Sequence, residues 1–202
     1  MKKFLIIFVS LVMLFLISFT VVYADYIYTV KAGDSMWRIA QKTEVGLSEL
    51  KRANPEIKNY SLIYPGEKIN VPTISDEVLN YEKEVIRLIN EIRASYGLNA
   101  LKEDWELSRV ARFKSQDMQE RNYFSHTSPT YGSPFQMMKS FGIAYKSAAE
   151  NIAKGYSTPR AVVDAWMRSS GHRANILNSS FTHIGVGYIK SGHYVTEMFI
   201  SK

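Results

Sequence analysis

The sequence contains no cysteine among its 202 residues. Disulfide bonds and cysteine-ligated metal sites are therefore excluded, so the folded chain must rely on its hydrophobic core. The sequence also lacks a run of basic residues. Its 25 Lys and Arg and 19 Asp and Glu are spread along the chain and leave a net charge of +6. This dispersed charge argues against nucleic acid as a partner and is compatible with a weak attraction to anionic polymers.

Signatures of common enzyme classes are also missing. The chain has no Gly-x-Ser-x-Gly, no His-Glu-x-x-His, no phosphate-binding loop and no dinucleotide-binding glycine pattern. A Ser-x-x-Lys match at residues 48–51 lies inside an expected helix, and we interpret it as chance. The sequence thus offers no nucleophile or cofactor motif of a familiar hydrolase or nucleotide enzyme.

A long apolar stretch occurs at the N-terminus. Residues 4–22 are almost purely apolar, follow Lys2 and Lys3, and lead into Val-Tyr-Ala at 22–24. This order is typical of a secretory signal peptide, so we predict residues 1–24 to be one. The alternative is an uncleaved anchor, because the apolar run is long enough to cross a bilayer. Both interpretations place the remaining chain outside the cytoplasmic membrane, and cleavage would leave no stable membrane span.

Residues 25–72 are the first expected folded unit. Their β-prone runs lie at 26–30 and 68–72, and two short helical patterns begin at Met36 and Leu47. This order predicts a small βααβ domain. In residues 28–40, 50–54 and 62–69 the unit resembles a LysM domain.

The resemblance to LysM implies a shallow groove that binds peptidoglycan or another glycan containing N-acetylglucosamine. Backbone groups of two turns would bond the acetamide groups, and apolar side chains would cover the sugar face. In the alternative interpretation, Met36, Ile63 and Tyr64 only close the small core. The candidate glycan-binding residues are Gly33, Asp34, Ser35, Met36, Leu62, Ile63, Tyr64 and Pro65.

Residues 73–75 are a short linker, and residues 76–202 are the second expected unit. Helix-start signals at Ser75 or Asp76, Asp104, Ser133 and Thr158 precede four helical patterns. Two β-prone runs, near 182–189 and 193–200, close the chain. Helices followed by strands predict an α+β fold.

This second unit resembles the bacterial branch of the CAP superfamily, whose members are also called SCP domains. The resemblance implies a three-layer α-β-α sandwich with a central cleft. The matching stretches follow the family's order, at residues 88–93, 123–126, 150–153, 166–177 and 181–187.

Two histidines and one glutamate offer the most distinctive chemistry. The sequence indicates that His126, Glu150 and His172 lie in three separate turns. By the resemblance they match the family's first histidine, first glutamate and second histidine, whereas the second acidic residue expected after Trp166 is missing. These three residues could bind Zn²⁺ or another divalent metal, or act as acid and base without a metal. In the structural alternative, Glu150 only ties loops together.

These features predict an exported protein of the cell wall or, by resemblance to bacterial LysM-plus-CAP proteins, of the spore envelope. The LysM domain would hold peptidoglycan, and the CAP domain would bind a metal or a small ligand. Two alternatives stay open, namely a metal-assisted hydrolase of wall polymers or peptides and a secreted lipid-binding protein. The sequence favours a binding protein over an enzyme.

Overall fold

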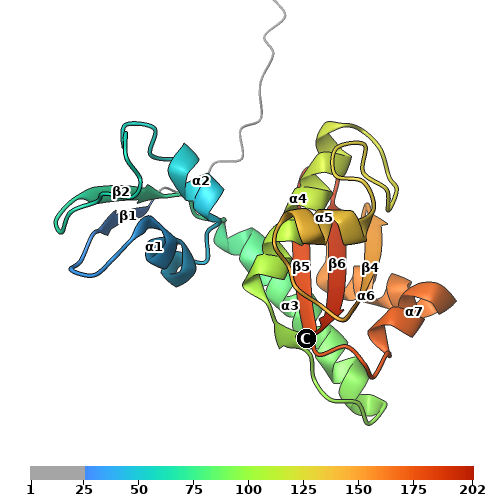
Figure 1. Cartoon of the computed structure of the whole chain (residues 1–202). Coiled ribbons are helices and arrows are strands. Elements are labelled where there is room, and N and C mark those ends of the chain that lie inside the picture. Colours follow the sequence, from blue (N-terminus) through green and yellow to red (C-terminus); the bar gives the residue numbers. More distant parts are fainter. Residues whose placement is uncertain (1–25) are drawn as a thin grey trace, which may run out of the picture.

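The computed structural model describes residues 26–202, and the expected signal peptide lies outside them. The described chain forms two units, a small one at the N-terminal side and a larger one that follows it (Figure 1). Both units mix helices and strands, which confirms the predicted α+β fold class. Across residues 26–202, every helix is too short or too polar to cross a bilayer.

The small unit is an antiparallel strand pair with two helices between the strands in sequence. Its first helix begins at Met36 because the Ser35 hydroxyl accepts a hydrogen bond from the backbone N–H of Arg38. The helices and the sheet share one apolar core, in which Ile39, Leu50 and Ile69 are fully buried. The elements are β1 (Tyr26–Thr29), α1 (Met36–Thr43), α2 (Leu47–Arg52) and β2 (Lys68–Val71).

The large unit is a four-stranded sheet with helices on both faces (Figure 1). The strand order is β3-β5-β6-β4, in which β3 and β5 are parallel and the other neighbours are antiparallel. Helices α4 and α5 pack on one face, and α3 and α6 pack on the other. The elements are α3 (Asp76–Ser95), β3 (Lys102–Glu103), α4 (Trp105–Glu120), α5 (Pro134–Ser140), β4 (Ser147–Lys154), α6 (Pro159–Arg168), α7 (Ser170–Ile176), β5 (His183–Ile189) and β6 (Tyr194–Ser201).

Two glycines let α4 lie directly on the sheet. A Cβ atom at Gly185 would lie 2.4 Å from the backbone of Leu107, and one at Gly187 would lie 2.0 Å from the backbone nitrogen of Arg112. Any larger residue would force the helix away from β5. The glycines therefore fix the position of α4, which anchors the site described below.

Two of the expected turns are regular structure instead. Residues 149–153 belong to β4, and residues 170–176 form α7. Strand β4 forms because it pairs with β6 along its whole length, a long-range partner that local sequence does not reveal. Helix α7 follows α6 almost directly, separated by Ser169 in an extended conformation. The prediction of turns was therefore wrong for Glu150 and His172.

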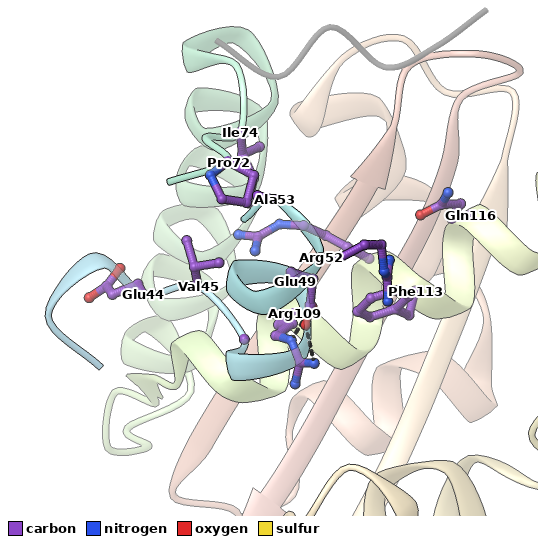
Figure 2. Close-up of a pocket in the computed structure, with 12 residues that line it drawn as sticks. Glu44, Val45, Glu49, Arg52, Ala53, Pro72, Ile74, Arg109, Phe113 and Gln116 are labelled. Carbon is purple, nitrogen blue, oxygen red and sulfur yellow. Dashed lines mark hydrogen bonds and ion pairs between the residues drawn. The ribbon is translucent and has the colours of Figure 1, made fainter. Parts of the chain in front are cut away.

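The two units contact each other through an ion pair between α2 and α4 (Figure 2). Arg109 donates from Nε to Glu49 Oε1 at 2.5 Å and from Nη2 to Glu49 Oε2 at 2.7 Å. The guanidinium also lies 5.4 Å from the ring centre of Phe113 and 5.1 Å from that of Phe141. A Cβ at Gly46 would lie 2.2 Å from Arg109 Nε, so the contact needs glycine there. The bidentate ion pair and the aromatic contacts together fix one orientation of the Arg109 guanidinium.

Candidate functional site

His126 and Glu150 are in direct contact. His126 lies in the loop between α4 and α5, Glu150 lies on β4, and His126 Nδ1 is 2.7 Å from Glu150 Oε1. The imidazole is 53% exposed, whereas the carboxylate is only 2% exposed. A carboxylate at Nδ1 orients the ring and leaves Nε2 as the nitrogen available to a ligand.

The second oxygen of Glu150 is buried and has no hydrogen-bond partner. Burial raises the pKa of Glu150, although the hydrogen bond with His126 and the charge of Lys114 lower it. An unpaired carboxylate oxygen in a buried position costs free energy unless it is protonated or meets a donor. Glu150 therefore offers one oxygen to a proton or to a donor group of a ligand.

His172 lies near this pair, in the first turn of α7. Its carbonyl oxygen accepts a hydrogen bond of 3.2 Å from Asn151 Nδ2, next to Glu150 in sequence. Burial lowers the pKa of His172, and the charge of His126 lowers it further. The neutral imidazole is thereby favoured, which is the form that accepts a hydrogen bond. The three predicted residues thus lie in one region, with His126 and Glu150 in contact and His172 beside them.

A metal centre would need three ligands that face one point. In the described part of the chain, no three His, Cys, Asp or Glu side chains are arranged to hold a metal ion. One oxygen of Glu150 is instead bonded to His126. Glu150 therefore acts as a group that orients the imidazole ring of His126.

Sequence reasoning missed the role of Lys114, which holds the loop that carries His126. Lys114 is 1% exposed, and its Nζ donates to the carbonyl oxygens of Ser125 at 2.7 Å and His126 at 2.9 Å. Burial lowers the pKa of Lys114, whereas the charges of Glu150 and Asp117 raise it. A signal was present in the sequence, because Lys114 falls on the apolar face of its helix and a lysine there needs acceptors.

Asp117 anchors the same loop one helical turn later. It accepts hydrogen bonds from the hydroxyls of Tyr123, Ser128 and Thr130, at 2.5, 2.7 and 2.5 Å. Burial raises the pKa of Asp117, but these hydrogen bonds outweigh it and keep the pKa below the ordinary value. Because both anchors come from α4, the position of His126 is set by that helix.

A second buried acid, Glu197, lies beneath α7. It is fully buried, and burial raises its pKa to about 8. Asn151 Nδ2 donates to Glu197 Oε2 at 3.0 Å, whereas Glu197 Oε1 has no partner. Asn175 donates to Asn151 Oδ1 at 2.8 Å, and Asn151 also bonds the carbonyl of His172. This chain of polar groups links the middle of the sheet to α7, and a glutamate inside the β-prone run at 193–200 was its sequence signal.

The two LysM turns adjoin each other. The backbone N–H of Val30 donates to the carbonyl of Glu67, and the N–H of Gly66 donates to the carbonyl of Val30, both at 2.9 Å. Asp34 is already paired within the LysM domain, because hydrogen bonds from the Lys42 ammonium, the Lys31 backbone N–H and the Tyr28 hydroxyl lower its pKa to about 2. Asp34 therefore shapes the first turn.

The candidate glycan-binding side chains divide into buried and exposed ones. Met36 is 2% exposed and belongs to the core, and Ile63 packs against that core. Leu62 and Tyr64 are 53% and 55% exposed. Figure 1 shows the segments around both turns on the side of the LysM unit away from the larger unit. Leu62 and Tyr64 are thus large apolar side chains that a sugar could reach.

The fold and its sites define a two-domain protein, a small βααβ module followed by an α-β-α sandwich. The chain belongs to the cysteine-rich secretory protein (CAP) family, whose model matches residues 86–201. A LysM domain matches residues 28–72. Both resemblances noted in the sequence are thereby confirmed, in a chain that has no cysteine.

Three comparisons place the chain among bacterial proteins. It is 60% identical to the uncharacterized protein YkwD of Bacillus subtilis over 137 residues, 67% of this chain and 53% of the relative. It is 36% identical to the uncharacterized membrane protein YlbC of Bacillus subtilis over 184 residues, 86% of this chain and 53% of the relative. A crystal structure of an extracellular protein with an SCP domain from Bacillus anthracis is 32% identical, with a TM-score of 0.60, over 68% of this chain and 47% of that one.

The chain spans about half the length of the curated relatives it matches. LysM domains bind peptidoglycan and other glycans of N-acetylglucosamine. Their combination with a CAP domain indicates an extracellular protein associated with the cell wall.

Proposed function

We propose that this protein is exported and binds peptidoglycan through the two LysM turns. The observation that supports this proposal is the exposure of Leu62 and Tyr64 beside a backbone that hydrogen bonds from Val30 to Gly66 and Glu67 hold at the end of the turn. Exposed apolar side chains next to fixed backbone groups suit a ligand with an apolar face and an amide, such as N-acetylglucosamine. A location in the spore envelope is a further proposal that rests on the resemblance alone.

Sedimentation with insoluble peptidoglycan tests the wall-binding proposal. We expect residues 25–72 to pellet with the polymer and residues 76–202 to stay in solution. Tyr64→Ala should weaken binding about tenfold, a loss of roughly 1.4 kcal/mol. Ile27→Ala is the matched control, because Ile27 is a similarly exposed apolar side chain, at 58%, on β1. If residues 25–72 stay in solution, the proposal is wrong.

We further propose that the CAP domain binds a small polar ligand at His126, Glu150 and His172. The supporting observation is the buried, unpaired oxygen of Glu150 beneath a half-exposed imidazole. A ligand that donates an N–H or O–H group would satisfy this oxygen. His126 and His172 would then contact the rest of the ligand.

A divalent metal is the competing ligand at these residues, and calorimetric titration with Zn²⁺ distinguishes the two. If the site takes metal, His126→Ala and His172→Ala should each reduce Zn²⁺ affinity at least tenfold. His183→Ala serves as control, because His183 is bonded to Thr182 at the start of β5. If the wild type and the three variants show the same Zn²⁺ affinity, the proposal of a metal ligand is wrong. Chemical shifts of the His126 ring during titration with soluble wall fragments then test the polar ligand directly, and unchanged shifts would count against it.

The hydrolase and lipid-binding alternatives stay predictions. Mass spectrometry of fragments released from peptidoglycan, with and without Zn²⁺, tests the hydrolase. Release by the wild-type chain that His126→Ala abolishes would favour an enzyme over a binding protein. Retention of a fatty acid by the purified chain would favour the lipid-binding alternative.

A further inference from the structure

Two hollows flank the ion pair between Glu49 and Arg109. The first, drawn in Figure 2, has a volume of about 350 Å³. The second has a volume of about 590 Å³ and lies between α1 and α2 of the LysM domain and α4 and α5 of the CAP domain. Both volumes fall in the range of roughly 300–1,000 Å³ typical of ligand pockets, which often lie between domains.

Three charged side chains that line the first hollow are already paired. Arg109 is bonded to Glu49, and Arg112 forms a bidentate pair with the buried Glu82, at 2.8 and 2.7 Å. The walls between these charges are mostly apolar. Phe113 is the one aromatic side chain that lines this hollow, so it suits a sugar less well than the second hollow.

The second hollow differs because both domains contribute a tryptophan to it. Trp37, from α1, is 59% exposed, and Trp105, at the start of α4, is partly buried. A tryptophan left this exposed beside a concave surface is characteristic of a binding site. Flat indole rings suit the apolar face of a pyranose ring.

Polar groups with spare capacity lie among these rings. Gln41 Nε2, on the LysM side, is 3.4 Å from Glu106 Oε1, on the CAP side. This separation is at the long end for a hydrogen bond, so both groups can exchange it for a hydroxyl or an acetamide. Ser48 also lines this hollow, but its hydroxyl is already engaged, because it donates to Glu49 Oε2 at 2.6 Å and accepts from Arg109 Nη2 at 3.2 Å. A few directed polar groups among aromatic walls give a sugar both orientation and affinity.

We propose that this hollow between the domains is a second saccharide site, which takes a residue of the same N-acetylglucosamine-containing polymer. Trp37 and Trp105 cover the apolar face of the sugar, and Gln41 and Glu106 bond its hydroxyl or acetamide groups. The inference rests on the proposed glycan binding. It adds that the CAP domain contributes contacts to the glycan, which the LysM turns alone would not provide.

Titration of residues 26–202 with chitin oligosaccharides of four to six sugars tests the inference. Calorimetry gives the affinity, and a change in tryptophan emission on binding reports on Trp37 and Trp105, because Trp166 is buried and out of reach of a sugar. We expect Trp37→Ala and Trp105→Ala each to lower the affinity about tenfold, whereas Trp37→Phe keeps most of it. The exposed Glu106→Ala is the second CAP-side variant, for use if Trp105→Ala fails to fold.

The outcomes separate this inference from the proposed function. If Tyr64→Ala weakens binding but Trp37→Ala and Glu106→Ala do not, the second site is wrong and binding by the LysM turns stands. If the wild-type chain binds no oligosaccharide and no peptidoglycan, both are wrong. Weaker binding by the CAP-side variants, with unchanged unfolding temperature, supports the shared site.

Discussion

The two domains differ in what they bury and what they expose. Among the described residues, Asn54 is the one polar residue of the LysM domain that is buried as a whole, and the domain exposes several large apolar side chains. The CAP domain differs because it encloses ionisable groups in its interior. We therefore expect ligand binding at the apolar LysM surface to depend little on pH. We expect the CAP site to depend on the protonation of its ionisable groups. The buried ionisable side chains of the CAP domain are Glu82, Arg93, Lys114, Asp117, Glu150 and Glu197.

Glu197→Gln tests the claim that buried ionisable groups make the CAP domain sensitive to pH. It is the substitution with the largest expected effect on stability. Burial raises the pKa of Glu197 from 4.5 to about 8, so the folded chain keeps a proton that the unfolded chain releases. The stabilisation from this proton is complete below about pH 4.5 and is lost as the pH rises to about 8. At roughly 1.4 kcal/mol per pKa unit, the loss is at most about 5 kcal/mol. Because glutamine mimics the protonated acid, the variant should lose less stability between pH 5 and pH 9.

Urea unfolding at pH 5, 7 and 9 measures this difference. Glu103→Gln is the control, because it makes the same substitution at an exposed position of β3. Parallel pH curves for the wild type and Glu197→Gln would show that the buried acid does not set the alkaline stability.

Lys114→Met tests whether the His126 loop depends on its buried anchor. Without the ammonium, the carbonyl oxygens of Ser125 and His126 lose their donor, and each unpaired acceptor costs about 1–3 kcal/mol. We expect a loss of about 3 kcal/mol in the free energy of unfolding and faster amide exchange in residues 121–132. Lys83→Met, at an exposed position of α3, should change stability by less than about 0.5 kcal/mol. Unchanged exchange in the loop would contradict the anchor.

The sequence predicts the LysM half better than the CAP site, for a physical reason. Local signals define the small domain, since Ser35 caps α1 as its residue type predicts. The helix caps at Asp104, Ser133 and Thr158 agree with their predicted helix starts, and Ser75 is one of the two residues predicted to cap α3. In contrast, Glu150 was assigned to a turn because its strand exists only through pairing with β6.

The partners of the CAP site were harder still to predict. Asn151 and Glu197 meet only across strands β4 and β6, which lie more than forty residues apart in sequence. No local sequence pattern predicts such a contact, whereas the position of Lys114 on the apolar face of its helix can be recognised from the sequence. The candidate residues of the site could therefore be predicted from the sequence, but the hydrogen-bond network that holds them could not.

Asn54→Ala tests how much the buried Asn54 contributes to the stability of the LysM domain. The expected loss in the free energy of unfolding is smaller than for Lys114→Met. Its amide donates to the carbonyls of Leu50 and Asn70, at 2.7 and 2.8 Å, and its oxygen accepts from the Asn70 N–H at 2.7 Å. These bonds join α2 to β2, so we expect a loss of about 2 kcal/mol. Thermal unfolding of residues 26–72, followed by Trp37 emission, detects it. An unchanged transition would mean that the apolar core alone holds this domain.

Tyr64→Ala tests whether the exposed LysM surface serves binding rather than stability. We expect almost no effect on the free energy of unfolding. Tyr64 is more than half exposed, so its loss should change the free energy of unfolding by less than about 0.5 kcal/mol while peptidoglycan binding weakens. Met36→Ala, on the buried side of the other turn, should instead cost about 2–5 kcal/mol. Urea unfolding and sedimentation of both variants separate the two roles. If Tyr64→Ala destabilises as much as Met36→Ala, Tyr64 is part of the core, and the LysM surface loses its main apolar contact with the sugar.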